Sequence, residues 1–312
     1  MKLAIIFPGQ GSQSVGMLAG YGELASVRQI VADASDVLKQ DIAKLITDGP
    51  AADLNRTVNT QPVMVTVGYA VYCAWLELGG TVPAMVAGHS LGEYTALVAA
   101  GSLTLMDCLP LVRLRAQAMQ DAVPQGQGAM AALLGLDDEG VRSACAAAAN
   151  GEVVEPVNFN APGQVVIAGH AKAVARAIEK ARELGAKRAV ALPVSAPFHS
   201  SLMAPAAEKL RDALRSVPVM PPQIPVVQNV DGLVRSDPDD IRAALVKQAN
   251  HPVRWVDCVR FMADAGVTNV FESGPGKVLA PLCKRISPGL DGLALADRAG
   301  MNQGLALIGK GA

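Results

Sequence analysis

The most constraining feature of the sequence is a short apolar segment that runs directly into a glycine-rich turn and then into a helical pattern. Residues 84–88 have the length and composition of a buried strand, and residues 93–100 those of a helix that ends at Gly101. A second apolar run, Leu3–Phe7, stops at Pro8-Gly9 and is typical of a buried parallel strand. The 312-residue chain is 51% hydrophobic, enough to cover such a sheet with two layers of helix. We therefore expect an α/β fold.

The pattern changes in the middle of the chain, where strand-like and helical stretches follow one another in the order βαββαβ. The strand-like stretches are 129–134, 152–159, 164–168 and 188–194, and the helical ones are 137–149 and 171–184. This order is typical of a ferredoxin-like unit, whose chain ends lie close enough together for insertion into another domain.

Two further strand-like stretches, 226–229 and 269–272, return to the first pattern. We predict a large α/β-hydrolase-like domain with a parallel sheet, formed by residues 1–125 and 198–312. We also predict an inserted ferredoxin-like subdomain, formed by residues 126–197, and a cleft between the two.

Composition argues against several classes of function. The formal net charge of −1 and the pI near 6.4 give no reason to expect nucleic acid or an anionic membrane surface as a partner. The five cysteines form no Cys-x-x-Cys pair, so neither a zinc site nor a redox motif is expected. The longest apolar stretch, residues 63–76, falls short of the ~20 residues that span a bilayer, and Leu3–Phe7 is too short for a signal sequence. We expect a cytoplasmic protein with reduced, packed thiols.

The turn between the strand and the helix reads Gly88-His89-Ser90-Leu91-Gly92, which fits the pattern Gly-x-Ser-x-Gly. In a strand–turn–helix context this pattern predicts a nucleophile elbow, with the serine presented above the N-terminus of the helix. The backbone N–H of Leu91 would then be one donor to an oxyanion. The alternative is an ordinary glycine-rich turn.

A serine nucleophile needs a base, and the chain has four histidines. His89 should point to the other side of the elbow, and His170, at a strand-to-helix junction, suggests a surface or capping role. His199 lies where the inserted unit rejoins the large domain and can face the cleft. His251 precedes Pro252 in a loop, which suggests a structural or exposed role but leaves it open as a base. The residues alone favour His199.

Four separated motifs together resemble the malonyl-CoA:acyl carrier protein transacylase family, over essentially the whole chain. They are Phe7-Pro8-Gly9-Gln10-Gly11-Ser12-Gln13, Gly88-His89-Ser90-Leu91-Gly92-Glu93-Tyr94, Pro197-Phe198-His199-Ser200, and Gln248 with Asn250-His251-Pro252-Val253-Arg254-Trp255. The block before Pro252 departs from the family, because a bulkier residue is expected there. The shape of the pocket near that block is therefore open.

The resemblance implies a role for particular residues of this chain. Ser90 matches the nucleophile that carries the acyl group and His199 its general base. Gln10 and Leu91 match the two backbone donors of the oxyanion hole. Gln248 matches the residue whose main-chain carbonyl orients the histidine. Arg115 matches the arginine that binds the malonyl carboxylate, although without the family a surface arginine with a buried stem is the commoner case.

The implied reaction is a ping-pong transfer of the malonyl group from malonyl-CoA to phosphopantetheinylated acyl carrier protein. It needs no ATP, metal or redox cofactor. The resemblance implies a monomer and leaves fatty acid or polyketide synthesis open. The carrier is acidic in this family's pathway, so Lys187, Arg188, Lys284 and Arg285 are candidates for its docking surface, against the alternative that they are ordinary solvated charges.

Two competing functions remain. An α/β-hydrolase esterase or thioesterase shares the elbow but passes the acyl group to water; it requires an acidic third member and has no use for Arg115. A silent module that only docks carrier protein has no need of both Ser90 and His199.

Overall fold

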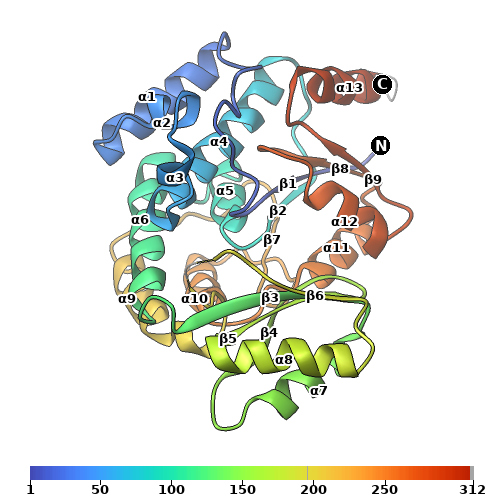
Figure 1. Ribbon diagram of the computed structural model, residues 1–312. Coiled ribbons are helices and arrows are strands. Elements are labelled where there is room, and N and C mark those ends of the chain that lie inside the picture. Colours follow the sequence, from blue (N-terminus) through green and yellow to red (C-terminus); the bar gives the residue numbers. More distant parts are fainter. Residues whose placement is uncertain (195, 310–312) are drawn as a thin grey trace.

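The computed structural model describes residues 1–194 and 196–309, so residues 195 and 310–312 of the predicted domains lie outside the described residues. Two separate sheets form within this part of the chain (Figure 1). The larger is wholly parallel in the order β7-β2-β1-β8-β9, and the smaller is antiparallel in the order β4-β5-β3-β6. The predicted α/β class is confirmed.

The strands of the parallel sheet are β1 (Leu3–Phe7), β2 (Met85–Gly88), β7 (Val226–Val227), β8 (Asn269–Glu272) and β9 (Asp291–Ala294). The helices around this sheet are α1 (Ala25–Leu38), α2 (Ile42–Thr47), α3 (Ala51–Leu54), α4 (Thr57–Glu77), α5 (Gly92–Ala99), α6 (Leu105–Asp121), the 3-10 turn η1 (Ser201–Met203), α9 (Ala204–Leu214), α10 (Pro238–Ala249), α11 (Trp255–Asp264), α12 (Leu279–Ile286) and α13 (Arg298–Gly309).

Side chains of β1 alternate between two hydrophobic cores, which explains its unbroken apolar sequence. Ile5 and Phe7 pack with α4, α5 and α6 on one face of the sheet. Ala4 and Ile6 pack with α11 and α12 on the other face. Figure 1 shows these two groups of helices on opposite sides of β1, β2 and β8. A strand buried on both faces has no position for a polar side chain.

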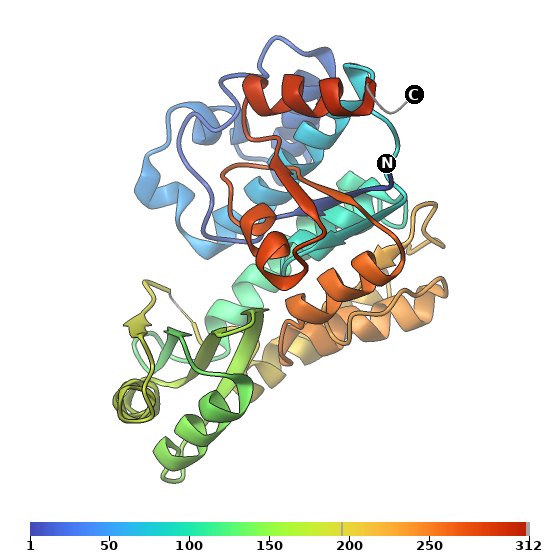
Figure 2. The ribbon, with the colours of Figure 1, turned by 90° about the vertical axis from the view of Figure 1, so that its right-hand side faces the viewer.

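The smaller sheet belongs to a second compact unit made of β3 (Gly128–Leu134), α7 (Asp138–Ala148), β4 (Val154–Ala161), β5 (Gln164–His170), α8 (Ala171–Glu183) and β6 (Arg188–Ala191). Its βαββαβ order and antiparallel pairing are those of the expected ferredoxin-like unit. Helices α7 and α8 cover one face, and Figure 2 shows the unit projecting from one end of the molecule. The exact boundaries at 125/126 and 197/198 stay a prediction.

Two details differ from the sequence expectation. Strand β7 has two residues and not four, because Gln228 bonds to the turn at Leu233 and the backbone N–H of Asn229 donates to the Glu93 carboxylate. Strand β9 and helix α13 were not anticipated. For β9 the reason is that two of its four residues, Asp291 and Gly292, give no apolar signal.

The start of α5 packs against β1 without room for a side chain. A Cβ at Gly92 would lie 2.1 Å from the carbonyl oxygen of Phe7, and one at Gly88 would lie 1.9 Å from the carbonyl carbon of Gly92. Both contacts are with backbone, which cannot move aside. These two glycines therefore fix how closely the turn between them approaches β1.

We expect Gly92→Ala to destabilise the protein by about 3 kcal/mol, because the added methyl group overpacks a rigid backbone contact. Urea unfolding of this variant measures the effect. Gly289→Ala is the matched control, since no atom lies within 4 Å of a Cβ at that exposed glycine. Equal stability of the two variants would contradict the prediction.

Candidate active site

A pocket of about 590 Å³ lies between the two units. The large domain contributes its polar lining, which includes Gln10, Gln61, Ser90, Arg115 and His199. The small unit and the segment that follows it contribute a mostly apolar wall, which includes Met130, Asn158, Leu192, Pro193 and Val194. The sequence-predicted cleft is therefore a cavity with polar groups on one side and apolar groups on the other.

Ser90 occupies a tight turn between β2 and α5. Its φ is +51°, a left-handed conformation that residues other than glycine rarely adopt. The side chain of Asn229, which follows β7, holds this turn: its Oδ1 accepts the Ser90 N–H at 2.5 Å and its Nδ2 donates to the Gly88 carbonyl at 2.6 Å. Sequence reasoning missed Asn229, whose only signal is its position after a strand of the sheet.

Ser90 and His199 lie side by side although 109 residues separate them, with Ser90 Oγ 2.6 Å from His199 Nε2. The other ring nitrogen, Nδ1, is 2.8 Å from the main-chain oxygen of Gln248. That carbonyl can only accept, so Nδ1 carries the proton and Nε2 is free to take one from the serine.

The imidazole of His199 is buried, and its backbone has a φ of +64°. Burial, with a smaller effect of the Arg115 charge, lowers the pKa of His199 from 6.5 to about 3. The resting imidazole is therefore neutral at physiological pH, as a base must be.

Gln10 and Leu91 face the same pocket from two loops. Neither backbone N–H donates to a protein acceptor within residues 1–194 and 196–309. Gln10 follows β1 and Leu91 opens α5, so the contact of Gly92 with Phe7 brings these two segments together at the pocket that Ser90 also lines. Such a pair can stabilise an oxyanion.

Arg115 enters the pocket from α6, whose start is capped by the Thr104 hydroxyl. Its side chain is buried and its guanidinium lies 5.3 Å from the ring centroid of Tyr94. The NH1 group donates to Gln61 Oε1 at 2.8 Å, and NH2 lies 3.0 Å from Gln248 Oε1 and 3.4 Å from Ser90 Oγ. No ion pair to Arg115 occurs in the described ranges, so a buried cation faces the serine without a carboxylate in contact.

A buried carboxylate, Glu93, lies behind the pocket in the first turn of α5. Its oxygens accept from the backbone N–H of Asn229 at 2.8 Å and from the side-chain amide of Gln248 at 3.1 Å. Burial raises the pKa of Glu93 from 4.5 to about 7 in spite of these donors. Glu93 belongs to the motif of residues 88–94, from which no role could be predicted for it.

The remaining histidines have other partners. His89 Nε2 is 2.8 Å from Asn160 Oδ1, but His89 lines the same pocket as His199, whereas the sequence predicted it on the other side of the elbow. His170 accepts the backbone N–H of Val153, and His251 is exposed beside Asn250. All five cysteines are free thiols, and four of them are buried.

Other sequence features also have a place in the structure. Lys187 and Arg188 lie at the start of β6, whereas Lys284 and Arg285 lie on α12. Arg285 donates to Gln164 Oε1 at 2.6 Å, and Lys284 pairs with an aspartate of β9, so two of the four are already engaged. Across the described ranges, every helix is too short or too polar to cross a membrane, and no group of three or more His, Cys, Asp and Glu side chains is placed to hold a metal ion.

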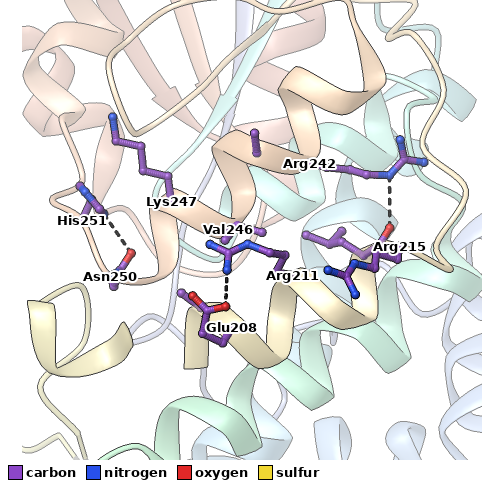
Figure 3. A pocket seen from close by; sticks show the side chains of 11 residues that line it. Glu208, Arg211, Arg215, Arg242, Val246, Lys247, Asn250 and His251 are labelled. Carbon is purple, nitrogen blue, oxygen red and sulfur yellow. Dashed lines mark hydrogen bonds and ion pairs between the residues drawn. The ribbon is translucent and has the colours of Figure 1, made fainter. Parts of the chain in front are cut away.

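A second hollow, of about 430 Å³, lies between α9 and α10 (Figure 3). Its rim is charged, but two of its arginines are paired: Arg211 with Glu208, as Figure 3 shows, and Arg242 with Asp239. The lining holds no serine or cysteine that could act as a nucleophile. The pocket around Ser90 is therefore the candidate active site.

The fold and this pocket together define an α/β protein with an elbow serine beside a buried histidine. The model of the family described as Acyl transferase domain matches residues 4–285, and the chain belongs to this family. The malonyl CoA-acyl carrier protein transacylase of Escherichia coli (strain K12) is 50% identical over 307 residues, which cover 98% of this chain and 99% of that protein. The protein of the same name from Bacillus subtilis (strain 168) is 43% identical, with 95% and 94% covered.

Solved structures agree with this assignment. An acyl-carrier-protein S-malonyltransferase from Burkholderia pseudomallei 1710b is 60% identical with a TM-score of 0.96, over 98% of this chain and 100% of that one. A malonyl-transacylase in complex with a type II PKS acyl-carrier protein is 46% identical with a TM-score of 0.97, again over 98% and 100%. The sequence-based resemblance is confirmed over the whole length.

We expect the buried carboxylate of Glu93 to make stability depend on pH. The folded pKa of about 7 lies above the ordinary 4.5, so the folded state binds more protons between these values and stability falls as pH rises. At about 1.4 kcal/mol per pH unit, the loss reaches about 3 kcal/mol above pH 7.

Urea unfolding of the wild type and Glu93→Gln at pH 5 and pH 8 measures this. The stability of the wild type relative to the variant should fall by about 3 kcal/mol between the two pH values. Glu77→Gln is a control in which the pH dependence of stability should have the opposite sign. Hydrogen bonds from Ser26 lower the pKa of that exposed carboxylate. A difference between wild type and Glu93→Gln that does not change with pH would rule out the titration.

Proposed function

We propose that this protein transfers the malonyl group of malonyl-CoA to the phosphopantetheine thiol of acyl carrier protein through a malonyl ester on Ser90. The observation that carries the proposal is the position of the Arg115 guanidinium, buried and without a carboxylate in contact, 3.4 Å from Ser90 Oγ. An acyl group that ends in a carboxylate fits there, because a guanidinium can pair with that carboxylate while the serine attacks the thioester. The names of the relatives support the same substrate pair.

In the first half-reaction His199 Nε2 takes the proton of Ser90, and Ser90 Oγ attacks the thioester carbon. The negative charge that develops on the carbonyl oxygen is stabilised by the backbone N–H groups of Gln10 and Leu91. The carbon–sulfur bond then breaks, and the coenzyme A thiolate leaves with the proton from His199. The product is malonyl-Ser90, and no net proton is gained or lost.

In the second half-reaction His199 takes the proton of the pantetheine thiol, and the sulfur attacks the ester carbon. The carbon–oxygen bond to Ser90 breaks, and Ser90 recovers its proton from His199. One thioester is exchanged for another, so the reaction requires no external energy source.

The charge of Arg115 also affects the base. In the free protein this charge helps to lower the pKa of His199. A malonyl carboxylate bound to the guanidinium would offset that charge, so His199 would become a stronger base when the correct acyl group is present.

The hydrolase and the silent module fit the pocket less well. A hydrolase has no use for a buried guanidinium beside its serine, and here the Nδ1 partner of His199 is a main-chain carbonyl and not a carboxylate. A silent module has no need of a 2.6 Å contact between serine and histidine. The monomeric state, the cytoplasmic location and the roles of the four basic residues in docking stay predictions.

We expect brief incubation with malonyl-CoA to add one malonyl group to the wild type and none to Ser90→Ala, as measured by intact-protein mass spectrometry. Addition of phosphopantetheinylated acyl carrier protein should then move the group to the carrier. An adduct lost to water with the carrier left unloaded would indicate the hydrolase. The absence of any adduct would indicate the silent module.

We expect Arg115→Ala to lower kcat/KM for malonyl transfer by at least about 100-fold, because it removes a buried charge-assisted pair with the substrate carboxylate. Acetyl transfer should be unchanged or faster. Arg113→Ala is the matched control: it lies on the same helix but donates to the Leu38 carbonyl, away from the pocket. Equal loss for malonyl and acetyl groups in Arg115→Ala would show that the arginine supports the fold alone.

A further inference from the structure

The proposed reaction leaves Glu93 without a role, although a buried carboxylate is unfavourable for the fold. Glu93 is fully buried and does not line the pocket. It is the one acidic residue on α5, a helix whose other side chains are apolar or neutral. Its position three residues after Ser90 places it directly behind the elbow.

Three N–H donors surround the Glu93 carboxylate. They come from the backbone of Asn229 at 2.8 Å, the side chain of Gln248 at 3.1 Å and the side chain of Gln228 at 3.3 Å. The ionised carboxylate, which prevails above the pKa of about 7, accepts at both oxygens and so suits a site that offers only donors.

The contact between Glu93 and Gln248 determines the orientation of the Gln248 side-chain amide. Gln248 Nε2 donates both to Glu93 and, at 2.9 Å, to the Ser90 carbonyl. With the nitrogen held on that side, Oε1 must face the other way, where it lies 3.0 Å from Arg115 NH2. A reversed amide would place N–H groups against the guanidinium and an oxygen against the carboxylate, two repulsive contacts.

Gln248 also holds the base through a different atom. Its main-chain oxygen bonds His199 Nδ1, whereas its side chain lies between Glu93 and Arg115. The two functions can therefore be separated by experiment, because substitution of the side chain leaves the main-chain carbonyl in place.

The arrangement keeps two buried opposite charges close without direct contact. Glu93 attracts Arg115 electrostatically, but the amide of Gln248 lies between them. A direct ion pair would occupy the fork of the guanidinium. Here NH2 still faces Ser90 Oγ, and Nε has no hydrogen-bond partner among the described residues.

We propose that Glu93 is a positioning residue that acts through the side-chain amide of Gln248 to orient Arg115 and compensate its charge, and so sets the preference for acyl groups that end in a carboxylate. This inference rests on the proposed function, in which Arg115 binds that carboxylate. The competing explanation is that Glu93 only stabilises the start of α5, as acidic residues in a first helical turn do.

The test compares acylation of Ser90 by malonyl-CoA and by acetyl-CoA in four proteins: Glu93→Gln, Gln248→Met, the double variant and the wild type. We expect Glu93→Gln to lower the malonyl-to-acetyl ratio of kcat/KM by at least about 10-fold, mainly through a higher KM for malonyl-CoA. Gln248→Met should have a similar effect, and the double variant should be no worse than Gln248→Met alone, because both changes remove one relay.

Glu272→Gln is the matched control. Glu272 is also fully buried, and its carboxylate accepts the backbone N–H groups of Val278, Leu279 and Ala280 at the start of α12, away from the pocket. This variant should lose stability and keep the wild-type substrate ratio.

Equal losses for malonyl and acetyl groups in Glu93→Gln, with the ratio unchanged as in Glu272→Gln, would overturn the proposal. If Glu93→Gln does not fold, Gln248→Met alone tests the proposal. An unchanged malonyl-to-acetyl ratio in that variant would also overturn it. Additive losses in the double variant would also overturn the relay. A wild type that forms no malonyl adduct would instead contradict the proposed function, so the two failures are distinguishable.

Discussion

The arrangement around Ser90 depends on one close approach, in which the backbone at the start of α5 lies directly against the end of β1. Gly92 meets the carbonyl of Phe7, and Gly88 meets Gly92, at separations that leave no space for a Cβ. Because of this contact, the loop that carries Gln10 and the turn that carries Ser90 open into one pocket. The backbone donors of the site are therefore fixed by main-chain packing, before any side chain is placed.

The buried titratable side chains of the site make the folded protein less stable. Burial raises the pKa of Glu93 and lowers that of His199, so each group is held where its charged form is disfavoured. Apolar replacement of a whole buried ion pair is often neutral or stabilising, so such pairs are retained at a cost in stability. Direct pairing of Arg115 with Glu93 would reduce the cost but would also occupy the guanidinium. The Gln248 amide lies between the two charges, which explains why they do not form a direct ion pair. It also explains why NH2 of Arg115 still faces Ser90 Oγ.

The sequence was informative wherever one residue type has one common use. Unbroken apolar runs such as Leu3–Phe7 predicted the parallel sheet, and the elbow motif predicted the position of Ser90. The motif could not identify Asn229 or Gln61, because an amide carries no signal until its partners across the fold are known. Glu93 was missed for a different reason: an acidic residue in a first helical turn is so common that its burial is invisible in the sequence.

His199 could be predicted from the order of the elements along the chain, but not from the spacing of the motifs alone. His199 lies where the chain returns from the small unit, and next to it Ser201 bonds the Glu155 carboxylate of that unit through both its N–H and its hydroxyl. The imidazole itself is held by Gln248, on α10 of the large domain. The apolar pocket wall at residues 192–194 belongs to the segment that joins the small unit to His199. The proposed catalytic pair is thus anchored to the large domain, while the chain immediately before His199 forms a wall of the pocket. The wall can therefore vary in shape without separating Ser90 from His199.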